Sequence, residues 1–520
     1  MTGLSRRGFI GLVAGVGAAA GVGVPLLSGM AGNASTATLL SSGLPLPRPF
    51  TVPLTLPPVL RPTRSDASGD HYEITQRAAS VEIIPGTRTT IWGYNGIFPG
   101  PTIESTSGRP AIVHHTNALP VPVVVHLHGG HTPEDSDGYP TDLILPANGI
   151  DPTMAGMPGM TTDPLARITT GERTYTFPLA QRGATLWYHD HRMAFTGASV
   201  WRGLAGFHIV RDPQENALPL PRGARELPLL IADRAFGADG SLRYPSKDPS
   251  LRMPGVDDPY SSGVLGDVIL VNGRPWPVAN VDRARYRLRL LNASNARSYQ
   301  LTLDPAPPGG GGFTQIGSDG GLLAAPITHD AIEMAPAERF DVIVDFGRYA
   351  PGTEVVLANG FGSGSTAVVM KFRVGSNTED ASRIPDTLST VTALDPAHAT
   401  VTRDFHFGYA GDKSGWYING QPYSPTNIAA TPKLGTTEVW RLVSDFAHPI
   451  HLHLVHFQVL SRGLSGPGAY DHGWKDVVAL RPAEEARIIA RFDDYPGRFV
   501  FHCHNLEHED MAMMGNFRVV

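Results

Sequence analysis

The chain has 520 residues, 41% of them hydrophobic, so it is long enough to bury substantial cores, and its length predicts about three domains of ordinary size. The formal net charge is −6, with 17% charged residues. Without a basic tract or a basic-aromatic stripe, the sequence excludes a nucleic-acid-binding role. Its one cysteine, Cys503, excludes an intramolecular disulfide and leaves that thiol free to bind a metal.

The N-terminus predicts export. Arg6-Arg7 precedes an apolar, Gly/Ala-rich stretch that runs to about Gly29, the pattern of a twin-arginine signal for folded proteins. A membrane anchor is the alternative, since the stretch is nearly long enough to span a bilayer. The glycines and the small residues at 31–34 favour cleavage. We therefore expect residues 1–34 to engage the twin-arginine export machinery. The mature protein is then expected to be secreted or in the cell envelope (periplasmic), with no stable membrane insertion.

After the signal, the sequence predicts an all-β protein. Short runs rich in Val, Ile, Leu and Phe alternate with clusters of Gly, Pro, Asn and Asp, and helical periodicity is hard to find. The chain holds 58 glycines and 46 prolines, so turns must be frequent. This composition is typical of β-sandwiches and Greek-key barrels.

Three weak copies of one pattern indicate a threefold internal repeat. Each copy has an Asn-Gly pair, then a strand-like run, then a turn that leads into another strand. The pairs are Asn95-Gly96, Asn272-Gly273 and Asn419-Gly420, the runs are 111–117, 286–292 and 438–444, and the turns are 182–183, 351–352 and 496–497. Turn-rich and solvated segments near 212–225 and 375–395 place the domains at 35–215, 216–385 and 386–520.

Histidine pairs separate the outer copies from the middle one. The first and third copies carry His-x-His at corresponding places, whereas the middle copy has Ser298 to Thr302 and Val356 to Asn359 there, without histidine. The pairs are His126 and His128, His189 and His191, His451 and His453, and His502 and His504. On a strand, residues i and i+2 share a face about 6.5 to 7 Å apart, so each pair could chelate one metal or serve two. Spacing alone does not decide between these options.

Cys503 marks a second kind of metal site. A thiolate, an imidazole and a thioether on one short segment, from Cys503, His508 and Met513, are ligands of a blue-copper electron-transfer site, which needs one more histidine. Because successive strand side chains point to opposite faces, His502 and His504 must face away from the metal of Cys503. The sequence therefore predicts two metal sites joined through one backbone segment.

Several longer motifs carry a family resemblance. From Tyr94 to Met514 the chain resembles three-domain multicopper oxidases, closest to the branch of spore-coat laccases and bilirubin oxidases. The motifs lie at 94–104, 126–140, 315–323, 335–341 and 448–457. The resemblance implies three cupredoxin-like Greek-key β-barrel domains. It also implies four copper ions: one type 1, one type 2 and a type 3 pair.

Carried over by motif, the resemblance implies a complete ligand set. The type 1 copper takes His448, Cys503 and His508, with Met513 as the weak axial ligand. The type 2 copper takes His126 and His451, and the type 3 pair takes His128, His189, His191, His453, His502 and His504. Two carboxylates, Asp137 and Glu509, stand where the family places its proton-handling groups. The alternative for each is an ordinary turn or surface carboxylate.

The implied activity is that of a secreted laccase-like oxidase, a monomer. It would oxidise phenols, aromatic amines or bilirubin-like pigments one electron at a time and reduce dioxygen to water. Two alternatives stay open: a cuprous or other metal-ion oxidase for copper tolerance, and a non-enzymatic exported scaffold of the same fold. The first is mildly supported by a soft-donor loop with Met154, Met157 and Met160, although a short apolar loop would look the same. The complete ligand set argues against the scaffold.

Overall fold

The computed structural model describes residues 37–149, 163–410 and 415–520. The predicted signal and the loop with Met154, Met157 and Met160 lie outside these residues. These described residues belong to one compact unit. Both predicted inner domain boundaries fall within this unit and stay predictions.

Two facing sheets form the first barrel, and each draws strands from separate parts of the sequence. The first sheet has the order β11-β7-β4-β3, with β5 paired to β4: β3 (Arg64–Asp66), β4 (Gly69–Val81), β5 (Thr89–Tyr94), β7 (Ala111–Asn117) and β11 (Glu172–Phe177). The second has the order β2-β6-β13-β12-β8: β2 (Val59–Leu60), β6 (Thr102–Thr106), β8 (Val125–His128), β12 (Ala184–Asp190) and β13 (Ala205–Arg211). Nearby, β9 (Ile144–Leu145) pairs with β10 (Thr169–Thr170). Tyr72, Val113 and Leu127 belong to the core of this barrel.

The middle barrel repeats this plan with a wider sheet. That sheet contains β14 (Glu226–Phe236), β15 (Leu242–Arg243), β17 (Val268–Val271), β18 (Arg274–Pro275), β20 (Arg285–Asn292), β22 (Phe313–Ser318), β23 (Gly321–His329) and β25 (Arg339–Asp345). The facing sheet contains β19 (Val278–Arg283), β21 (Tyr299–Asp304), β24 (Ala331–Met334), β26 (Glu354–Asn359) and β27 (Val368–Asn377). In addition, β1 (Thr38–Leu40) pairs with β16 (Val264–Gly266). The core of this barrel includes Leu288, Phe340 and Leu357.

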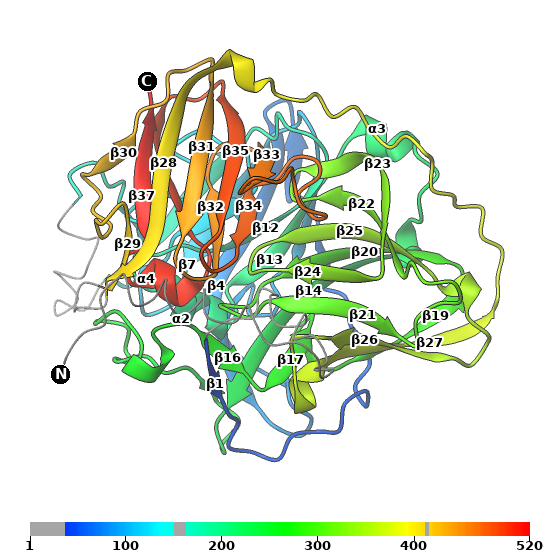
Figure 1. Cartoon of the computed structure of the whole chain (residues 1–520). Coiled ribbons are helices and arrows are strands. Elements are labelled where there is room, and N and C mark those ends of the chain that lie inside the picture. The colour runs from blue at the N-terminus through cyan, green and yellow to red at the C-terminus, as the bar shows by residue number, and fades with distance from the viewer. Residues whose placement is uncertain (1–36, 150–162, 411–414) are drawn as a thin grey trace, which may run out of the picture. The chain divides into compact units, whose positions relative to one another are not determined.

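The third barrel closes around Trp440, Phe501 and Phe517. Its first sheet has the order β29-β28-β31-β35-β33: β28 (Ala399–Ala410), β29 (Gly415–Ile418), β31 (Thr436–Ser444), β33 (Phe457–Arg462) and β35 (Glu485–Phe492). Its second has the order β30-β37-β36-β32-β34: β30 (Ile428–Ala430), β32 (His448–Leu452), β34 (Val477–Leu480), β36 (Gly497–Cys503) and β37 (Met514–Val519). Figure 1 shows these strands side by side in yellow to red.

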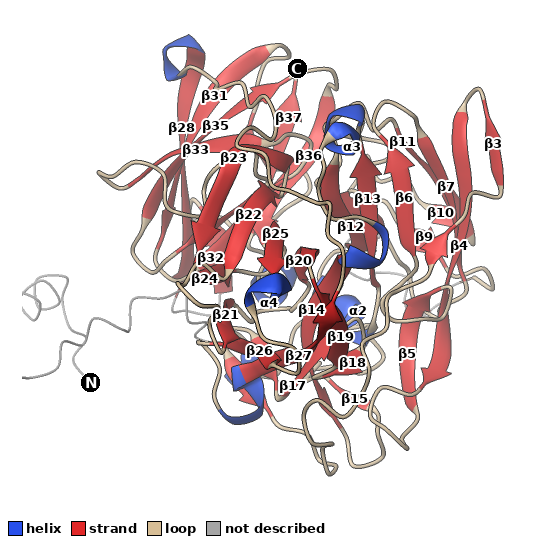
Figure 2. Ribbon diagram, turned by 90° about the vertical axis from the view of Figure 1, so that its right-hand side faces the viewer, coloured by secondary structure: helices blue, strands red, loops and turns tan. Residues whose placement is uncertain are grey.

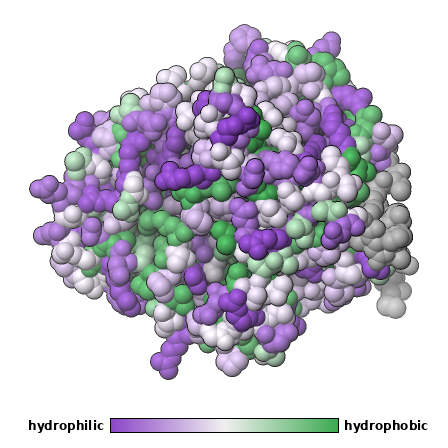
Figure 3. Space-filling view, turned by 180° about the vertical axis from the view of Figure 1, so that it is seen from behind, coloured by the Kyte–Doolittle hydropathy of each residue, from purple (hydrophilic) through white to green (hydrophobic). Residues whose placement is uncertain are grey.

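Helices are few and short in the described residues (Figure 2), so the all-β prediction is confirmed. They are α2 (Thr196–Arg202), α3 (Pro213–Ala217) and α4 (Leu506–Asp510), with 3-10 turns η2 (Gly223–Arg225), η3 (Asp258–Tyr260), η4 (Phe346–Arg348), η5 (Gly364–Ala367) and η6 (Pro396–His398). Among the described helices, none has the length and apolar character that a bilayer crossing requires. Figure 3 shows hydrophilic side chains over most of the visible face, with hydrophobic ones in smaller groups between them.

The repeated turns have the geometry that their sequence demands. Both residues of each Asn-Gly pair have positive φ: 56° and 72° at Asn95 and Gly96, with similar values in the other two pairs. This is the type I′ turn that Asn-Gly favours in hairpins. The predicted runs are strands β7, β20 and β31, and each predicted turn leads into β12, β26 or β36. The repeat seen in the sequence is thus a repeat of structure.

Candidate metal centres

The first candidate centre gathers around Cys503 at the end of β36. Its Sγ atom lies 3.5 Å from Nδ1 of His448 and 3.6 Å from Nδ1 of His508, and these two nitrogens are 3.2 Å apart. His448 begins β32 and His508 lies on α4. All three side chains are buried. One thiolate and two imidazoles converging in this way form the trigonal ligand set of a blue-copper site.

Hydrogen bonds within the loop hold the ligands in place. The Cys503 amide donates to the carbonyl of Met513 at 3.1 Å, and the Met513 amide donates to the carbonyl of His508 at 3.0 Å. The side-chain oxygen of Asn505 caps α4 by accepting a hydrogen bond from the backbone N–H of Glu507. The backbone N–H of Asn505 donates to the Cys503 sulfur. Burial raises the pKa of the Cys503 thiol well above its usual range. A thiolate is stable there only beside a cation such as a bound metal ion.

The two adjacent methionines lie in different environments. Met513 is buried in the hydrophobic cluster that contains Cys503. Met514 belongs to a separate cluster with Tyr139 and Val500 and pairs across the sheet with His502. The structure thus places the predicted axial residue on the Cys503 side of the strand and its neighbour on the other side.

The second candidate centre is a cluster of histidines between the first and third barrels. In the first barrel His126 on β8 is paired with His189 on β12, and in the third His451 on β32 is paired with His502 on β36. Two antiparallel pairs therefore present histidines to one shared space. All eight predicted trinuclear ligands are buried there: His126, His128, His189, His191, His451, His453, His502 and His504.

Within the cluster, three sets of rings can be compared. The Nε2 atoms of His126 and His451, the predicted type 2 pair, are 3.4 Å apart. Nε2 of His502 lies 3.2 Å from Nε2 of both His191 and His453. The third group is looser, and its ring centroids are 5.0 to 5.8 Å apart: His128, His189 and His504. The sets are not separate, because the centroids of His128 and His451 are 3.7 Å apart and those of His126 and His453 are 3.9 Å apart. All eight histidines therefore form one continuous cluster that could hold metal ions.

Unpartnered nitrogens show that these residues fit metal ions. Both ring nitrogens of His504, Nδ1 of His128 and Nε2 of His189 are buried without a hydrogen-bond partner. Leaving such an atom unsatisfied costs about 1–3 kcal/mol. Burial also lowers the pKa of these imidazoles, for His189 to about 3. They are therefore neutral near pH 7, which is the form that binds a metal.

Asp137 and Glu509 lie against different histidines of this cluster. Oδ2 of Asp137 accepts a hydrogen bond from Nδ1 of His453 at 2.8 Å, and its Oδ1 has no hydrogen-bond partner but lies 3.8 Å from Nδ1 of His126. Oε2 of Glu509 lies 3.1 Å from Nδ1 of His502, and its Oε1 lies 3.6 Å from Nδ1 of His191. Both carboxyl groups are buried, which excludes the surface alternative for each.

Their environments push the pKa values of the two groups apart. Burial, followed by repulsion from Asp142 and Glu134, raises the pKa of Asp137 well above its usual range. Burial also raises the pKa of Glu509, but attraction to His502 and His191 outweighs it and lowers the value to about 2. Two carboxyl groups that border one histidine cluster and have opposite shifts suit the roles of proton donor and proton acceptor.

One residue of this centre was not predicted from the sequence. Asp476 accepts a hydrogen bond on Oδ1 from Nε2 of His128 at 3.0 Å, and on its backbone oxygen from Nδ1 of His451 at 2.8 Å. Its carboxylate is also paired with the guanidinium of Arg339, which comes from the middle barrel. No ligand spacing in the sequence joins Asp476 to His128. Only its place just before β34, the strand beside β32, could have drawn attention to it.

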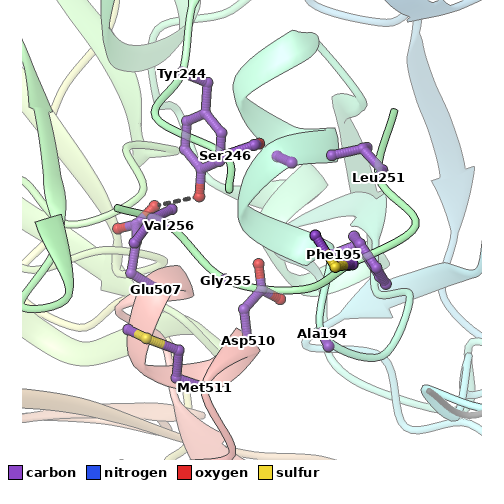
Figure 4. Close-up of a pocket in the computed structure, with 12 residues that line it drawn as sticks. Ala194, Phe195, Tyr244, Ser246, Leu251, Gly255, Val256, Glu507, Asp510 and Met511 are labelled. Carbon is purple, nitrogen blue, oxygen red and sulfur yellow. Dashed lines mark hydrogen bonds between the residues drawn. The ribbon is translucent and has the colours of Figure 1, made fainter. Parts of the chain in front are cut away.

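A small pocket beside α4 contains further carboxyl groups (Figure 4). The Tyr244 hydroxyl donates to Oε1 of Glu507 at 2.9 Å. Asp510 accepts from the amides of Thr196 and Gly197 at the start of α2, each at 2.8 Å. Burial raises the pKa of Glu507 to about 7. The Asp510 contacts join α4, which carries His508, to α2, and the Tyr244 contact joins α4 to the segment after β15.

Three histidines outside the His-x-His pairs make other contacts. His115 is buried against the side-chain amide of Gln76, at 2.9 Å. His131 lies between the carbonyl oxygen of Leu454 and the Asp494 carboxylate. His456 donates from Nε2 to the carbonyl of Gly129 at 3.0 Å. Among the described residues, none of these three belongs to a group with metal-binding geometry.

Known proteins share both sequence and fold with this chain. Family models described as multicopper oxidase match residues 75–153, 145–215 and 387–520. A laccase of Bacillus subtilis is 38% identical over 89% of this chain and 97% of its own length. A bilirubin oxidase of Albifimbria verrucaria is 34% identical, over 90% of this chain and 81% of its own length. The chain belongs to the multicopper oxidase family.

A crystal structure of a laccase from Pediococcus acidilactici superposes on this fold with a TM-score of 0.79. It is 31% identical, and the match covers 92% of this chain and 96% of the laccase. The prediction of three cupredoxin-like barrels is thereby confirmed. This multicopper oxidase is a copper-dependent, laccase-like oxidoreductase that uses dioxygen as electron acceptor.

Proposed function

We propose that the chain is an exported, laccase-like oxidase of phenols, aromatic amines or bilirubin-like pigments, and that it reduces dioxygen to water with four coppers. The observation that carries this proposal is the connection between the two centres. Cys503 contributes to one centre, and its neighbours in sequence, His502 and His504, contribute to the other. The similarity to a laccase and a bilirubin oxidase supports the substrate class.

The residues divide into three binding sites. His448, Cys503 and His508, with Met513 on the axial side, would hold the type 1 ion, and His126 and His451 the type 2 ion. The type 3 ions would be held by His191, His453 and His502 and by His128, His189 and His504. Bound copper supplies one-electron redox chemistry at the thiolate site and dioxygen reduction at the histidine site.

The protein contributes a short covalent path between the two centres. His502 and His504 are each one peptide bond from Cys503, and β36 holds His502 in register with His451. An electron that enters at the thiolate therefore reaches the histidine cluster through two side chains and a single peptide bond. Each dioxygen needs four electrons, whereas each donor molecule supplies one. We infer that the chain holds both centres rigidly so that electrons from successive donors can be stored until dioxygen is reduced.

Proton delivery is the second contribution of the chain. Burial raises the pKa of Asp137 well above its usual range, so this carboxyl group holds a proton more readily than an exposed one, and its Oδ1 has no hydrogen-bond partner. The pKa of Glu509 is instead lowered to about 2, so this carboxyl group is ionised. We assign Asp137 as a proton donor and Glu509 as a proton acceptor. Glu509 must release its proton again before the next turnover.

A cuprous-ion oxidase is the second candidate function. The observation that favours it is Asp445, whose side chain is 29% exposed and whose Oδ1 lies 3.3 Å from Nε2 of His448. A partly exposed carboxylate against a type 1 ligand could attract a cationic donor. The methionine loop, which would supply soft ligands, lies outside the described residues.

We further propose that the mature chain is a monomer outside the cytoplasm, exported by the twin-arginine machinery. The Arg6-Arg7 pair and the apolar stretch after it support export. Fractionation of cells that express the full chain, beside an Arg6→Lys, Arg7→Lys double variant, would test it. We expect the variant to remain in the cytoplasm with its signal attached.

The function itself is tested on purified, copper-loaded protein. We expect an intensely blue protein with four coppers per chain by elemental analysis. A single copper per chain would contradict the histidine centre and leave only an electron carrier. Turnover of a phenol, bilirubin and Cu(I) should then be compared at equal concentration. Rapid turnover of Cu(I) alone would favour the second candidate.

A further inference from the structure

A tryptophan covers one imidazole of the Cys503 centre. The indole of Trp416 stacks on the imidazole of His508, with ring centroids 3.6 Å apart and planes 29° apart. Its Nε1 donates to the carbonyl of Ser261 at 3.0 Å, which fixes the ring. Trp416 is 3% exposed and His508 is 1% exposed. The face of the imidazole therefore meets indole, not solvent.

The outer edge of His508 is covered as well. Its Nε2 lies 3.2 Å from Nδ2 of Asn505, which itself donates to the carbonyl of Ser262 at 3.1 Å. His448, the other imidazole of the centre, is 0% exposed. A reducing substrate cannot touch either imidazole and must stop at the layer of side chains outside them.

Around Trp416 that layer is aromatic. Tyr409, its partner across the β28–β29 pair, is 40% exposed, and the two ring centroids are 4.8 Å apart. Phe446 is also 40% exposed, with its ring centroid 6.0 Å from that of Trp416. We name Tyr409, Trp416 and Phe446 the aromatic cluster. It leads from the surface to His508 by ring contacts alone.

We propose that the aromatic cluster is the docking site for a planar aromatic donor, and that the Trp416 ring is the path by which its electron reaches the metal bound by His508. This inference rests on the proposed function and narrows its substrate class. A phenol would lose one electron inward and its hydroxyl proton to water, leaving a phenoxyl radical. The same electron reduces one Cu(II) to Cu(I). Trp416 carries the electron by tunnelling and is not itself oxidised.

The competing entrance is Asp445 beside His448. A carboxylate attracts a cation but offers a neutral ring no stacking surface, whereas exposed aromatic rings stack with other rings in offset or edge geometry. The two entrances thus favour different donors. A phenol should depend on Trp416 and Tyr409, and a cuprous donor should not.

The test is anaerobic stopped-flow bleaching of the blue absorption by a phenol. We expect Trp416→Leu to slow bleaching by about tenfold or more and Trp416→Phe, which keeps a ring, to restore most of the rate. Tyr409→Leu should weaken the dependence on phenol concentration. Tyr417→Leu is the matched control, because Tyr417 is on the same hairpin but its ring contacts His406 instead. The visible spectrum and type 1 potential of each variant show whether the ligands moved.

A second measurement does not depend on turnover. Saturation-transfer NMR with benzyl alcohol, a redox-inert ring, should show binding to copper-free wild type and to Tyr417→Leu, and a loss of binding in Tyr409→Leu. Unchanged bleaching by phenol in Trp416→Leu, or slower phenol bleaching in Asp445→Asn alone, would overturn the inference while leaving the oxidase function intact. If the blue wild type is bleached by none of the donors, both proposals fail.

Discussion

The outer barrels and the middle barrel use the same strand pairing for opposite purposes. At corresponding positions the first barrel pairs His126 with His189 and the third pairs His451 with His502, whereas the middle barrel pairs Leu301 with Asn359. Leu301 belongs to the hydrophobic core of its barrel. One backbone ladder thus accepts either metal ligands or core residues. The side chains, and not the strand geometry, decide whether a barrel contributes to the copper sites.

The middle barrel instead supports the histidine cluster from outside. Arg339 is fully buried and donates to the Thr185 carbonyl of the first barrel at 2.9 Å and to Oδ1 of Asp476 at 2.6 Å. Asp476 in turn binds His128 and His451. A barrel without ligands therefore joins both ligand-bearing barrels through one guanidinium group. The comparison predicts that outer-barrel variants lose chemistry and that middle-barrel variants lose stability.

The largest effect is expected for Cys503→Ser. A hydroxyl cannot replace the thiolate as ligand or as electron path, so the blue absorption and the oxidase turnover should both vanish. The chain should stay folded, since serine is close in volume to cysteine. Absorption, turnover and circular dichroism measure the three properties. Normal turnover in Cys503→Ser would show that the type 1 assignment is wrong.

The middle-barrel counterpart of this variant is Leu301→Ala. It should keep the blue colour of the protein but lower the free energy of unfolding by about 2–5 kcal/mol.

Next in size come Glu509→Gln and Asp137→Asn. An amide keeps the shape of each group but cannot cycle a proton, and general acid-base catalysis contributes about 10²–10⁴-fold. We expect reoxidation of the reduced enzyme by dioxygen to slow by a factor in this range, while bleaching by substrate changes little. Stopped-flow measurement of both half-reactions separates the two effects. Equal reoxidation rates in wild type and both variants would return these carboxylates to a packing role.

Arg339→Gln tests the middle barrel directly. Removing one partner of a buried ion pair leaves Asp476 charged and unpaired, which costs about 3–5 kcal/mol. Denaturant unfolding of the copper-free protein should show this loss, and copper content should fall because Asp476 also positions His128. The matched control is Arg373→Gln in the same barrel, which removes an exposed pair with Glu354. That change should cost about 1 kcal/mol or less. Equal losses in the two variants would contradict the role of Arg339.

Local patterns predicted most of the candidate ligands, whereas His448 and the division of the ligands among the coppers came from the family resemblance. His-x-His pairs on strands and the Cys503, His508, Met513 segment carry their spacing with them, and the Asn-Gly turns placed the repeats. Asp476, Arg339 and Trp416 have no such pattern. Each acts through a partner that is distant in the sequence: Asp476 through His128, Arg339 through Asp476 and Trp416 through His508. Contacts of this kind arise only when the barrels pack together.

The pKa values of the two carboxyl groups also depend on the folded structure. The sequence suggested proton handling by Asp137 and Glu509 but could not give them different roles. Their opposite pKa shifts arise in the fold: burial raises the pKa of Asp137, whereas at Glu509 attraction to His502 and His191 outweighs burial. Residue type predicts which groups can titrate, and only the folded surroundings decide the direction of the shift.

The smallest expected effects separate Met513 from Met514 within one barrel. Because Met513 lies in the cluster of Cys503, its thioether is placed to act as the axial ligand, and the axial ligand tunes the redox potential. Met513→Leu should keep the blue colour and raise the type 1 potential, since a weak donor to the oxidised ion is lost. Met514 packs with Tyr139 and Val500 instead. Met514→Leu is nearly volume-conserving and should cost less than about 1.5 kcal/mol while leaving the potential unchanged.

Redox titration of the two variants, with denaturant unfolding beside it, decides between these roles. Consecutive residues on an extended segment point to opposite faces, so only one of the two methionines can face the type 1 site. A shift of potential in Met514→Leu alone would place the axial ligand on the wrong face of β37 and would undermine the geometry assigned to Cys503. A shift of the type 1 potential in Met513→Leu alone would show that one residue step separates a ligand from a core residue within a ligand-bearing barrel. The middle barrel shows the same principle, because its strands hold core residues where the outer barrels hold ligands.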